Sequence, residues 1–341
     1  MQKKLLSLLS LFLLLFTITG CYQSSSNNST NDGSKDSIYP VTLTDQAGRE
    51  VVIEEEPERL VSGYYISTSL LMALDLDEKL VGIEAKGEKR QLYFKSAPEL
   101  IELPNVGTAK EFDLEGCIAL EPDLVILPLK LKNTASSLEQ LDIDVLYVNP
   151  ENQALLNEMI TLISTATNTQ QQAQNLNDFI AKQENELNSK LENVQRPSVY
   201  LAGNSNLLST AGSEMYQSSM ISLAGGSNVA DSIEGLYWVE IDYEQLLTWN
   251  PEYIILASDA TYSVEDVLND PNLKDCTAIQ NGKVFQLPND AEAWDSPVPS
   301  GILGSIWLSS ILHDDLFSAD ETNKIINEYY ETFYNFTYNQ N

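Results

Sequence analysis

Residues Gln170–Leu191 read QQQAQNLNDFIAKQENELNSKL and stand near the middle of the chain. One apolar stripe recurs at helical spacing, while Gln, Asn, Lys and Glu occupy the other faces, so the segment is predicted to form one long amphipathic helix. At about 1.5 Å per residue it would span roughly 33 Å, the width of a small domain. The apolar stripe of this long helix consists of Ala173, Leu176, Phe179, Ile180, Leu187 and Leu191. A shorter segment with apolar residues at helical spacing precedes it, and Thr167-Asn-Thr169 separates the two segments.

The segments on either side of this helix repeat each other. Asp113–Leu127 reads DLEGCIALEPDLVIL, and Asp242–Leu256 reads DYEQLLTWNPEYIIL. Each copy has an Asp suited to cap a helix, an acid in the first turn, a Pro that ends the helix and then an apolar strand. Chance likeness is the alternative, because helix–strand units are common in α/β folds. We favour two similar α/β lobes joined by one helix.

The order of strands and helices supports this fold class. Val41–Thr44 and Val51–Ile53 flank turn residues and predict a hairpin, and strands then alternate with helices in both halves. That alternation is typical of mostly parallel sheets. We therefore predict two Rossmann-like lobes with mostly parallel sheets, joined by a single long α-helix. The expected divisions are an N-terminal lobe at 38–166, a linking helix at 167–195 and a C-terminal lobe at 196–341.

The first residues form a targeting segment. Lys3 and Lys4 precede an apolar run that is shorter than the roughly 20 residues needed to span a bilayer, and small residues lead to Cys21. This pattern predicts a bacterial lipoprotein signal at 1–20, lipidation of the Cys21 thiol and an extracytoplasmic, membrane-anchored protein. An N-terminal membrane anchor with an incidental cysteine is the weaker alternative. The polar residues 21–37 are predicted to form a flexible tether.

Composition restricts the partners and the chemistry. The chain carries 19 Lys plus Arg against 50 Asp plus Glu, a formal net charge of −31, which disfavours nucleic acid and anionic lipid surfaces. His313 is the only histidine, which excludes a His-rich metal cage and counts against a Ser-His-Asp triad. Cys117 and Cys276 fall in different lobes, so no disulfide is expected. A carboxylate-pair hydrolase and a purely adhesive surface lipoprotein remain alternative functions for this protein. We nevertheless expect that the protein is not an enzyme and that it binds no cofactor.

Six short motifs carry a resemblance to a known family. The chain is similar to the class III substrate-binding proteins of ABC importers, which capture iron-siderophores, haem, cobalamin and, in some branches, molybdate or tungstate. The likeness covers Val41 to about Phe336. It rests on Thr44-Asp-Gln-Ala-Gly-Arg-Glu50, Pro57-Glu-Arg-Leu-Val61, Gly107-Thr108, Asp113-Leu-Glu115 with Glu121-Pro-Asp123, Leu223-Ala-Gly-Gly-Ser-Asn228, and Asp242-Tyr-Glu244 with Asn250-Pro-Glu252.

The resemblance implies partners and a mode of action. Two lobes would hold the ligand in the cleft between them, and a monomer would deliver it to a permease dimer and its ATPase subunits. In the family, one acidic residue of each lobe docks into an arginine pocket of the permease, and Glu115 and Glu244 hold these positions. Complementation of the helix dipole is the simpler role for both glutamates.

The ligand site is expected at loops that follow the carboxyl ends of strands. Aromatic side chains would give flat apolar walls, and the few basic groups favour an anionic ligand. For each aromatic residue, core packing is the alternative. We expect a metal chelate, a ferric siderophore or a corrinoid or haem, with molybdate or tungstate as the second candidate. The candidate residues are Tyr64, Tyr65, Lys89, Arg90, Tyr93, Thr108 and Lys110 in the first lobe, and Asn204, Tyr216, Tyr237, Trp238, Trp294 and Asp295 in the second.

Overall fold

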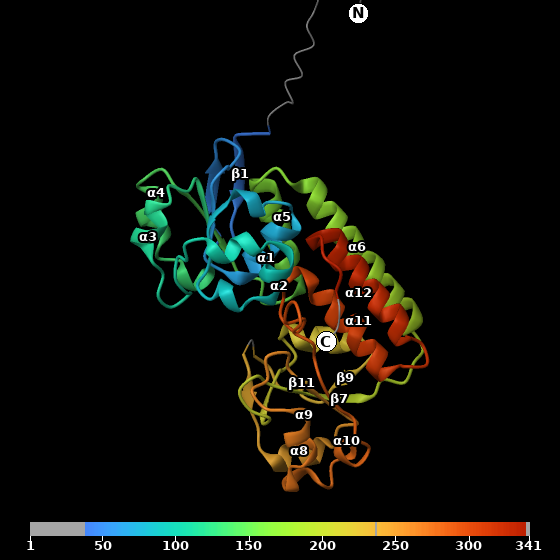
Figure 1. Ribbon diagram of the computed structural model, residues 1–341. Coiled ribbons are helices and arrows are strands. Elements are labelled where there is room, and N and C mark those ends of the chain that lie inside the picture. Colours follow the sequence, from blue (N-terminus) through green and yellow to red (C-terminus); the bar gives the residue numbers. More distant parts are fainter. Residues whose placement is uncertain (1–37, 236, 339–341) are drawn as a thin grey trace, which may run out of the picture. The chain divides into compact units, whose positions relative to one another are not determined.

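A computed structural model of the protein describes residues 38–235 and 237–338 (Figure 1). Residues from Ile38 onward form one compact unit. The signal segment, the tether and Cys21 lie outside the described residues. Within the described part of the chain, no helix is both long and apolar enough to cross a membrane.

The N-terminal half contains a hairpin and a parallel sheet. Strands β1 (Val41–Thr44) and β2 (Glu50–Ile53) pair antiparallel, as predicted. The four-stranded sheet has the order β4-β3-β5-β6, and all its neighbours are parallel. Its strands are β3 (Leu60–Ser62), β4 (Leu80–Gly82), β5 (Leu124–Pro128) and β6 (Asp144–Val148); the helices of this half are α1 (Tyr65–Ala73), α2 (Gln91–Ser96), α3 (Leu114–Ala119), α4 (Ala135–Glu139) and α5 (Gln153–Ala166).

The C-terminal half contains a mixed sheet. Strands β7, β11 and β12 are parallel, whereas β8 and β10 extend the sheet in the order β10-β8-β7-β11-β12 as antiparallel neighbours, and β9 pairs with β7. The strands are β7 (Ser198–Ala202), β8 (Ser209–Thr210), β9 (Ser227–Asn228), β10 (Val239–Glu240), β11 (Tyr253–Leu256) and β12 (Val284–Gln286); the helices are α7 (Tyr216–Leu223), α8 (Tyr243–Trp249), α9 (Val264–Leu268), α10 (Thr277–Gln280), α11 (Ile302–Leu312) and α12 (Ala319–Tyr334).

The sequence repeat is also a structural repeat. Asp113 caps α3 by accepting a hydrogen bond from the Gly116 amide, and Asp242 caps α8 in the same way. Glu121 and Asn250, at equivalent positions after the two helices, have φ angles of 49° and 46°. Each copy then continues into a strand flanked on both sides by parallel neighbours, β5 in one sheet and β11 in the other. The two halves therefore share one local architecture.

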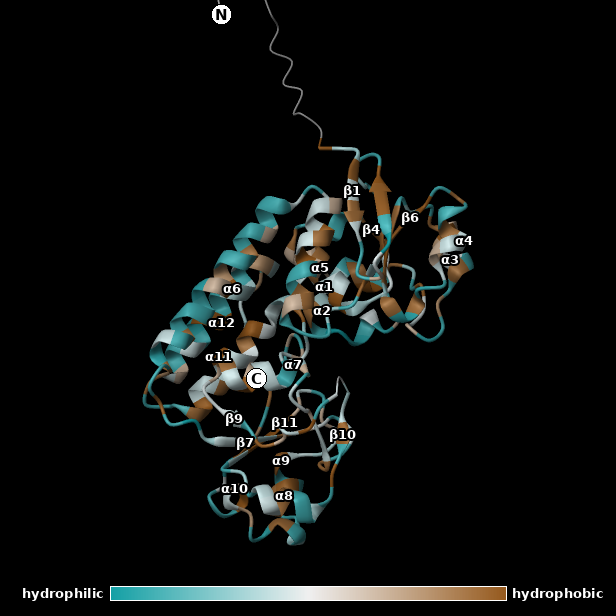
Figure 2. Cartoon of the chain, turned by 180° about the vertical axis from the view of Figure 1, so that it is seen from behind, coloured by the Kyte–Doolittle hydropathy of each residue, from teal (hydrophilic) through white to brown (hydrophobic). Residues whose placement is uncertain are grey.

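The predicted linking helix is α6 (Gln170–Lys190). The chain passes from β6 to β7 through α5 and α6, so it moves between the two sheets once. Hydrophilic residues cover much of α6 in Figure 2, and its buried stripe agrees with the predicted one. Phe179 of α6 makes edge contacts with Tyr329 and Phe333 of α12. Helix α12 also contacts α1, because the Ser69 and Tyr334 hydroxyl oxygens lie 3.0 Å apart.

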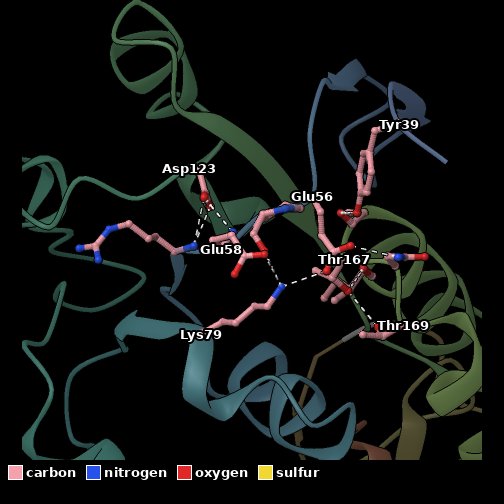
Figure 3. A network of polar contacts seen from close by, with 12 residues as sticks. Tyr39, Glu56, Glu58, Lys79, Asp123, Thr167 and Thr169 are labelled. Carbon is pink, nitrogen blue, oxygen red and sulfur yellow. Dashed lines mark hydrogen bonds and ion pairs between the residues drawn. The ribbon is translucent and has the colours of Figure 1, made fainter. Parts of the chain in front are cut away.

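Polar contacts fix the start of α6 to the first sheet (Figure 3). Asn168, in the turn between α5 and α6, has a φ of 56° and donates a hydrogen bond to Glu56 at 3.0 Å. Lys79 forms ion pairs with both Glu56 and Glu58. Nearby, the Glu58 and Arg59 amides donate to Asp123, which precedes β5. The Thr167–Thr169 interruption is thus a turn bonded to the entry of β3.

Position 107 requires glycine because of its backbone conformation, so replacement of Gly107 by alanine should destabilise the protein. Its φ is +87°, and an added Cβ would lie 2.1 Å from the Glu111 carbonyl oxygen. Gly48 is a matched control, because its φ is +77° but no atom lies within 4 Å of an added Cβ. We expect Gly48→Ala to cost about 1 kcal/mol of unfolding free energy and Gly107→Ala to cost more, about 2 to 3 kcal/mol, as measured by urea denaturation. Equal costs would contradict the clash.

Candidate ligand-binding site

A cavity of about 340 Å³ is lined by residues of both halves of the chain. The N-terminal residues come from the start of α1, from the segment before α2 and from the first turn of α2, and the C-terminal residues follow β11 and β12. The lining residues are Tyr65, Lys89, Arg90, Gln91, Leu92, Tyr93, Asp259, Asn289, Ala291, Glu292, Ala293, Ser296 and Val298.

Arg90 is the most unusual cation of this lining. Its guanidinium carbon lies 4.2 Å from the centre of the Tyr65 ring, in the geometry of a cation–π contact. Its Nε is buried and has no hydrogen-bond partner. Among the described residues, no carboxylate lies within ion-pair distance of Arg90. An arginine held in this way has donors free for an anionic group.

Two carboxyl groups interact electrostatically with Arg90. Glu84 is buried and accepts hydrogen bonds from Thr68 and Tyr93, both at 2.7 Å. Glu292 is partly buried and accepts from Ser69 at 2.6 Å and from Ser300 at 2.5 Å. Burial raises the pKa of both carboxyls from their ordinary range, and the Arg90 charge and the hydroxyl donors oppose that rise. Only Glu292 lines the cavity.

The C-terminal wall is bonded to the N-terminal half. The Leu92 amide donates to the Ala291 carbonyl at 3.1 Å, and the Ser69–Glu292 contact lies beside it along the chain. On its other side, the Asp295 carboxylate accepts from the Ser258 amide at 3.2 Å and so fixes this loop to the end of β11. The Ser258 hydroxyl is buried without a partner. The wall is therefore held from both halves.

Four of the residues nominated from the sequence meet at this cavity, namely Tyr65, Lys89, Arg90 and Tyr93. Tyr64 packs edge-on against Tyr65, with ring centres 5.3 Å apart. Thr108 and Lys110 lie in the turn after Gly107 and are not among the lining residues.

None of the six C-terminal candidates lines the cavity. Trp294 is packed in the core: it is 1% exposed, and its indole N–H donates to Tyr330 at 2.8 Å. Asp295 is also buried, and its carboxylate is used by the Ser258 amide. Tyr216 lines a separate cavity of about 150 Å³.

The other three C-terminal candidates lie elsewhere in that half. Tyr237 is 70% exposed, and Trp238 is partly buried against Gly203. Asn204 is exposed, and its carbonyl accepts from Thr261. The wall residues that sequence reasoning missed include Asp259 and Asn289, which follow β11 and β12, and that position was the available signal.

The two proposed docking residues are exposed at helix starts. Glu115 lies in the first turn of α3 and Glu244 in the first turn of α8. Glu244 also borders an open hollow of about 370 Å³ formed with β10. Neither glutamate lines the cavity at Arg90.

The single histidine and the two cysteines of the described residues are buried in the core. The His313 Nε2 lies 3.1 Å from the Gly225 carbonyl oxygen, in a buried position. Cys117 and Cys276 are buried free thiols in separate core clusters. Within residues 38–235 and 237–338, no group of three or more His, Cys, Asp and Glu side chains could hold a metal ion.

Known proteins share this architecture. The family model described as periplasmic binding protein matches residues 60–291. The molybdate-binding protein MolA of Haemophilus influenzae is 28% identical over 324 residues, which cover 87% of this chain and 91% of that protein. A vitamin B12-binding protein of Yersinia pestis is 27% identical over 204 residues, 59% of this chain and 69% of that one.

A solved structure extends the likeness to three dimensions. Haemophilus influenzae MolA bound to molybdate superposes with a TM-score of 0.77 at 27% identity, covering 88% of this chain and all of that chain. The matched family model covers more than half of this sequence and includes most of the cavity lining. This chain therefore belongs to the periplasmic binding protein family, as a class III substrate-binding protein of an ABC importer.

Proposed function

We propose that this protein captures a small tetrahedral oxyanion of the molybdate class in the cavity at Arg90 and delivers it to an ABC permease. The observation that carries the proposal is that Arg90 and Lys89 line one small cavity and that Arg90 has no ion-pair partner among the described residues. An oxyanion needs a compact set of donors, whereas a chelate needs a wide aromatic groove. The MolA relative supports the same ligand class.

The positive charge of Arg90 has to attract the anion although the chain as a whole is strongly negative. The formal net charge is −31, which repels anions at long range. The Arg90 guanidinium is partly desolvated and makes no ion pair within the described residues, so it acts on a ligand at short range with little screening. A small anion that enters the cavity would meet this cation directly.

The metal chelate expected from the sequence is the second candidate. It is supported by the vitamin B12-binding relative and by the exposed aromatic ring of Tyr237. Most of the aromatic residues nominated for a chelate groove, including Trp238 and Trp294, do not line the cavity, and this favours the oxyanion.

Isothermal titration calorimetry distinguishes the two candidates. Molybdate, tungstate, sulfate, a ferric siderophore, haem and cobalamin are titrated separately into the mature protein. We expect one molecule of molybdate or tungstate to bind per chain, with no binding of the chelates. Calorimetry is preferable to tryptophan quenching, because none of the four tryptophans lines the cavity. If only a chelate binds, the oxyanion proposal is wrong and the metal-chelate function is supported.

The cellular setting of this proposal comes from the first residues. Lipidation of Cys21 would hold the protein at the outer side of the cytoplasmic membrane, with the folded unit from Ile38 onward facing its permease. Mass spectrometry of the membrane-extracted protein tests this: Cys21→Ser should remove the lipid mass and release the protein from the membrane fraction.

A further inference from the structure

The cavity at Arg90 contains carboxyl groups, which a site for a fully deprotonated anion does not need; Asp259 is exposed, whereas Glu292 is partly buried. Glu292 stands in the lining together with Lys89 and Arg90. Within the described residues no cation lies within ion-pair distance of its carboxyl group. An ionised carboxylate there would face the oxygen atoms of the ligand, and two negative oxygens cannot approach each other without a shared hydrogen.

The surroundings of Glu292 leave it able to share that hydrogen. Each carboxyl oxygen is held by one hydroxyl, that of Ser69 or Ser300, and each has further lone-pair capacity. Three buried tyrosines of α12 also interact electrostatically with the carboxyl group. The titratable, charged and hydroxyl groups around it are Ser69 and Tyr65 of α1, Lys89, Arg90 and Tyr93 before and in α2, Asp259 after β11, Ser300 before α11, and Tyr329, Tyr330 and Tyr334 of α12.

We propose that the cavity takes up its oxyanion together with one proton, which is held between a Glu292 oxygen and a ligand oxygen. The proton comes from solvent, no covalent bond changes, and the complex is the same whether the proton is assigned to the carboxyl group or to the anion. This inference rests on the proposed function of the cavity. It names Glu292 as the residue that couples affinity to pH and disfavours anions that stay fully deprotonated and cannot share a proton.

The sign of the pH dependence follows from the same geometry. Burial already raises the pKa of Glu292 in the empty cavity, and a bound anion would raise it further. The association constant is therefore highest below the pKa of the empty site. It falls as pH rises toward the pKa of the filled site, by up to 10-fold per pH unit for one proton.

Titration calorimetry at pH 5.5 to 8.5 tests this, with molybdate in two buffers of different ionisation enthalpy. The wild-type protein should take up close to one proton per molybdate where its affinity falls. Glu292→Gln presents an amide N–H in place of the shared proton, so its affinity should be nearly independent of pH and at least 10-fold higher than wild type at pH 8.5. Glu84→Gln is the matched control, because the Glu84 carboxyl also interacts with the Arg90 charge and has a raised pKa but does not line the cavity. It should keep the wild-type slope.

The outcomes separate this inference from the proposed function. Molybdate binding without proton uptake, or the wild-type slope in Glu292→Gln, overturns the role of Glu292 and leaves oxyanion capture intact. Failure of every oxyanion to bind at any pH overturns both. If Glu292→Gln does not fold, the buffer comparison on the wild-type protein still decides the matter.

Discussion

Replacing Arg90 with glutamine is expected to weaken molybdate binding by about 30-fold to more than 1000-fold. Removing one partner of a buried charge-assisted contact costs about 2 to 5 kcal/mol, and about 1.4 kcal/mol corresponds to 10-fold in affinity. Arg90 meets the conditions for such a cost, because its Nε is buried without a partner and its guanidinium is positioned on Tyr65. Arg90→Lys keeps the charge but loses the planar fork, so an intermediate loss is expected.

A matched charge removal separates this local effect from a change in net charge. Lys132 is exposed in the segment after β5 and lies outside the cavity lining, so Lys132→Gln changes the net charge equally. Its molybdate affinity, measured by the same calorimetry, should stay within about 2-fold of wild type, since exposed charges at a distance are screened by salt. An Arg90→Gln protein that is folded and binds molybdate like wild type would remove Arg90 from the site.

Reversing the charge of both Glu115 and Glu244 to lysine is expected to abolish import while leaving ligand affinity intact. We propose that each carboxylate docks on a permease arginine, so each reversal places two like charges together at a cost of several kcal/mol. Loss of the helix-dipole contribution costs only about 0.3 to 1 kcal/mol per helix. Uptake of radiolabelled molybdate by cells that carry each variant measures the effect. Single reversals should give partial loss.

Glu265→Lys is the control for this experiment. Glu265 is exposed in the first turn of α9, so its reversal has the same dipole cost at a helix that we do not assign to docking. Import should remain close to wild type in that variant. Normal import by the Glu115→Lys, Glu244→Lys double variant would show that neither glutamate takes part in docking and that both serve only the first turns of their helices.

The elements with strong local signals could be predicted from the sequence. The apolar stripe of α6 and the paired Asp caps at Asp113 and Asp242 depend on near neighbours in the chain, and both were found where predicted. Helix α1 shows the limit of that approach. Ser67 and Thr68 have side chains suited to an N-cap, but the helix begins at Tyr65, and the Ser67 hydroxyl donates to the Tyr64 carbonyl while the Thr68 hydroxyl donates to Glu84.

The candidate site was only half predictable, for a physical reason. Lys89 and Arg90 were nominated because they lie in a segment that follows a predicted strand. The opposite wall depends on long-range contacts, such as Ser69 with Glu292 and Trp294 with Tyr330, which no local pattern records. An aromatic residue in a turn-rich segment has the same local sequence pattern whether it packs inward or faces a ligand, so the burial of Trp294 could not be read from the sequence.

The hydrogen bond between the Leu92 amide and the Ala291 carbonyl has a consequence for the rates of binding. Because that bond and the Ser69–Glu292 contact already join the two walls, the ordering of the binding groups is complete before the ligand arrives. We expect association to be limited by diffusion rather than by a conformational step, so that differences in affinity among anions are expressed in their residence times. Rapid release of the ligand to the permease would then require the permease to break the hydrogen bond between Leu92 and Ala291, because nothing in the binding protein alone favours separation of the two cavity walls.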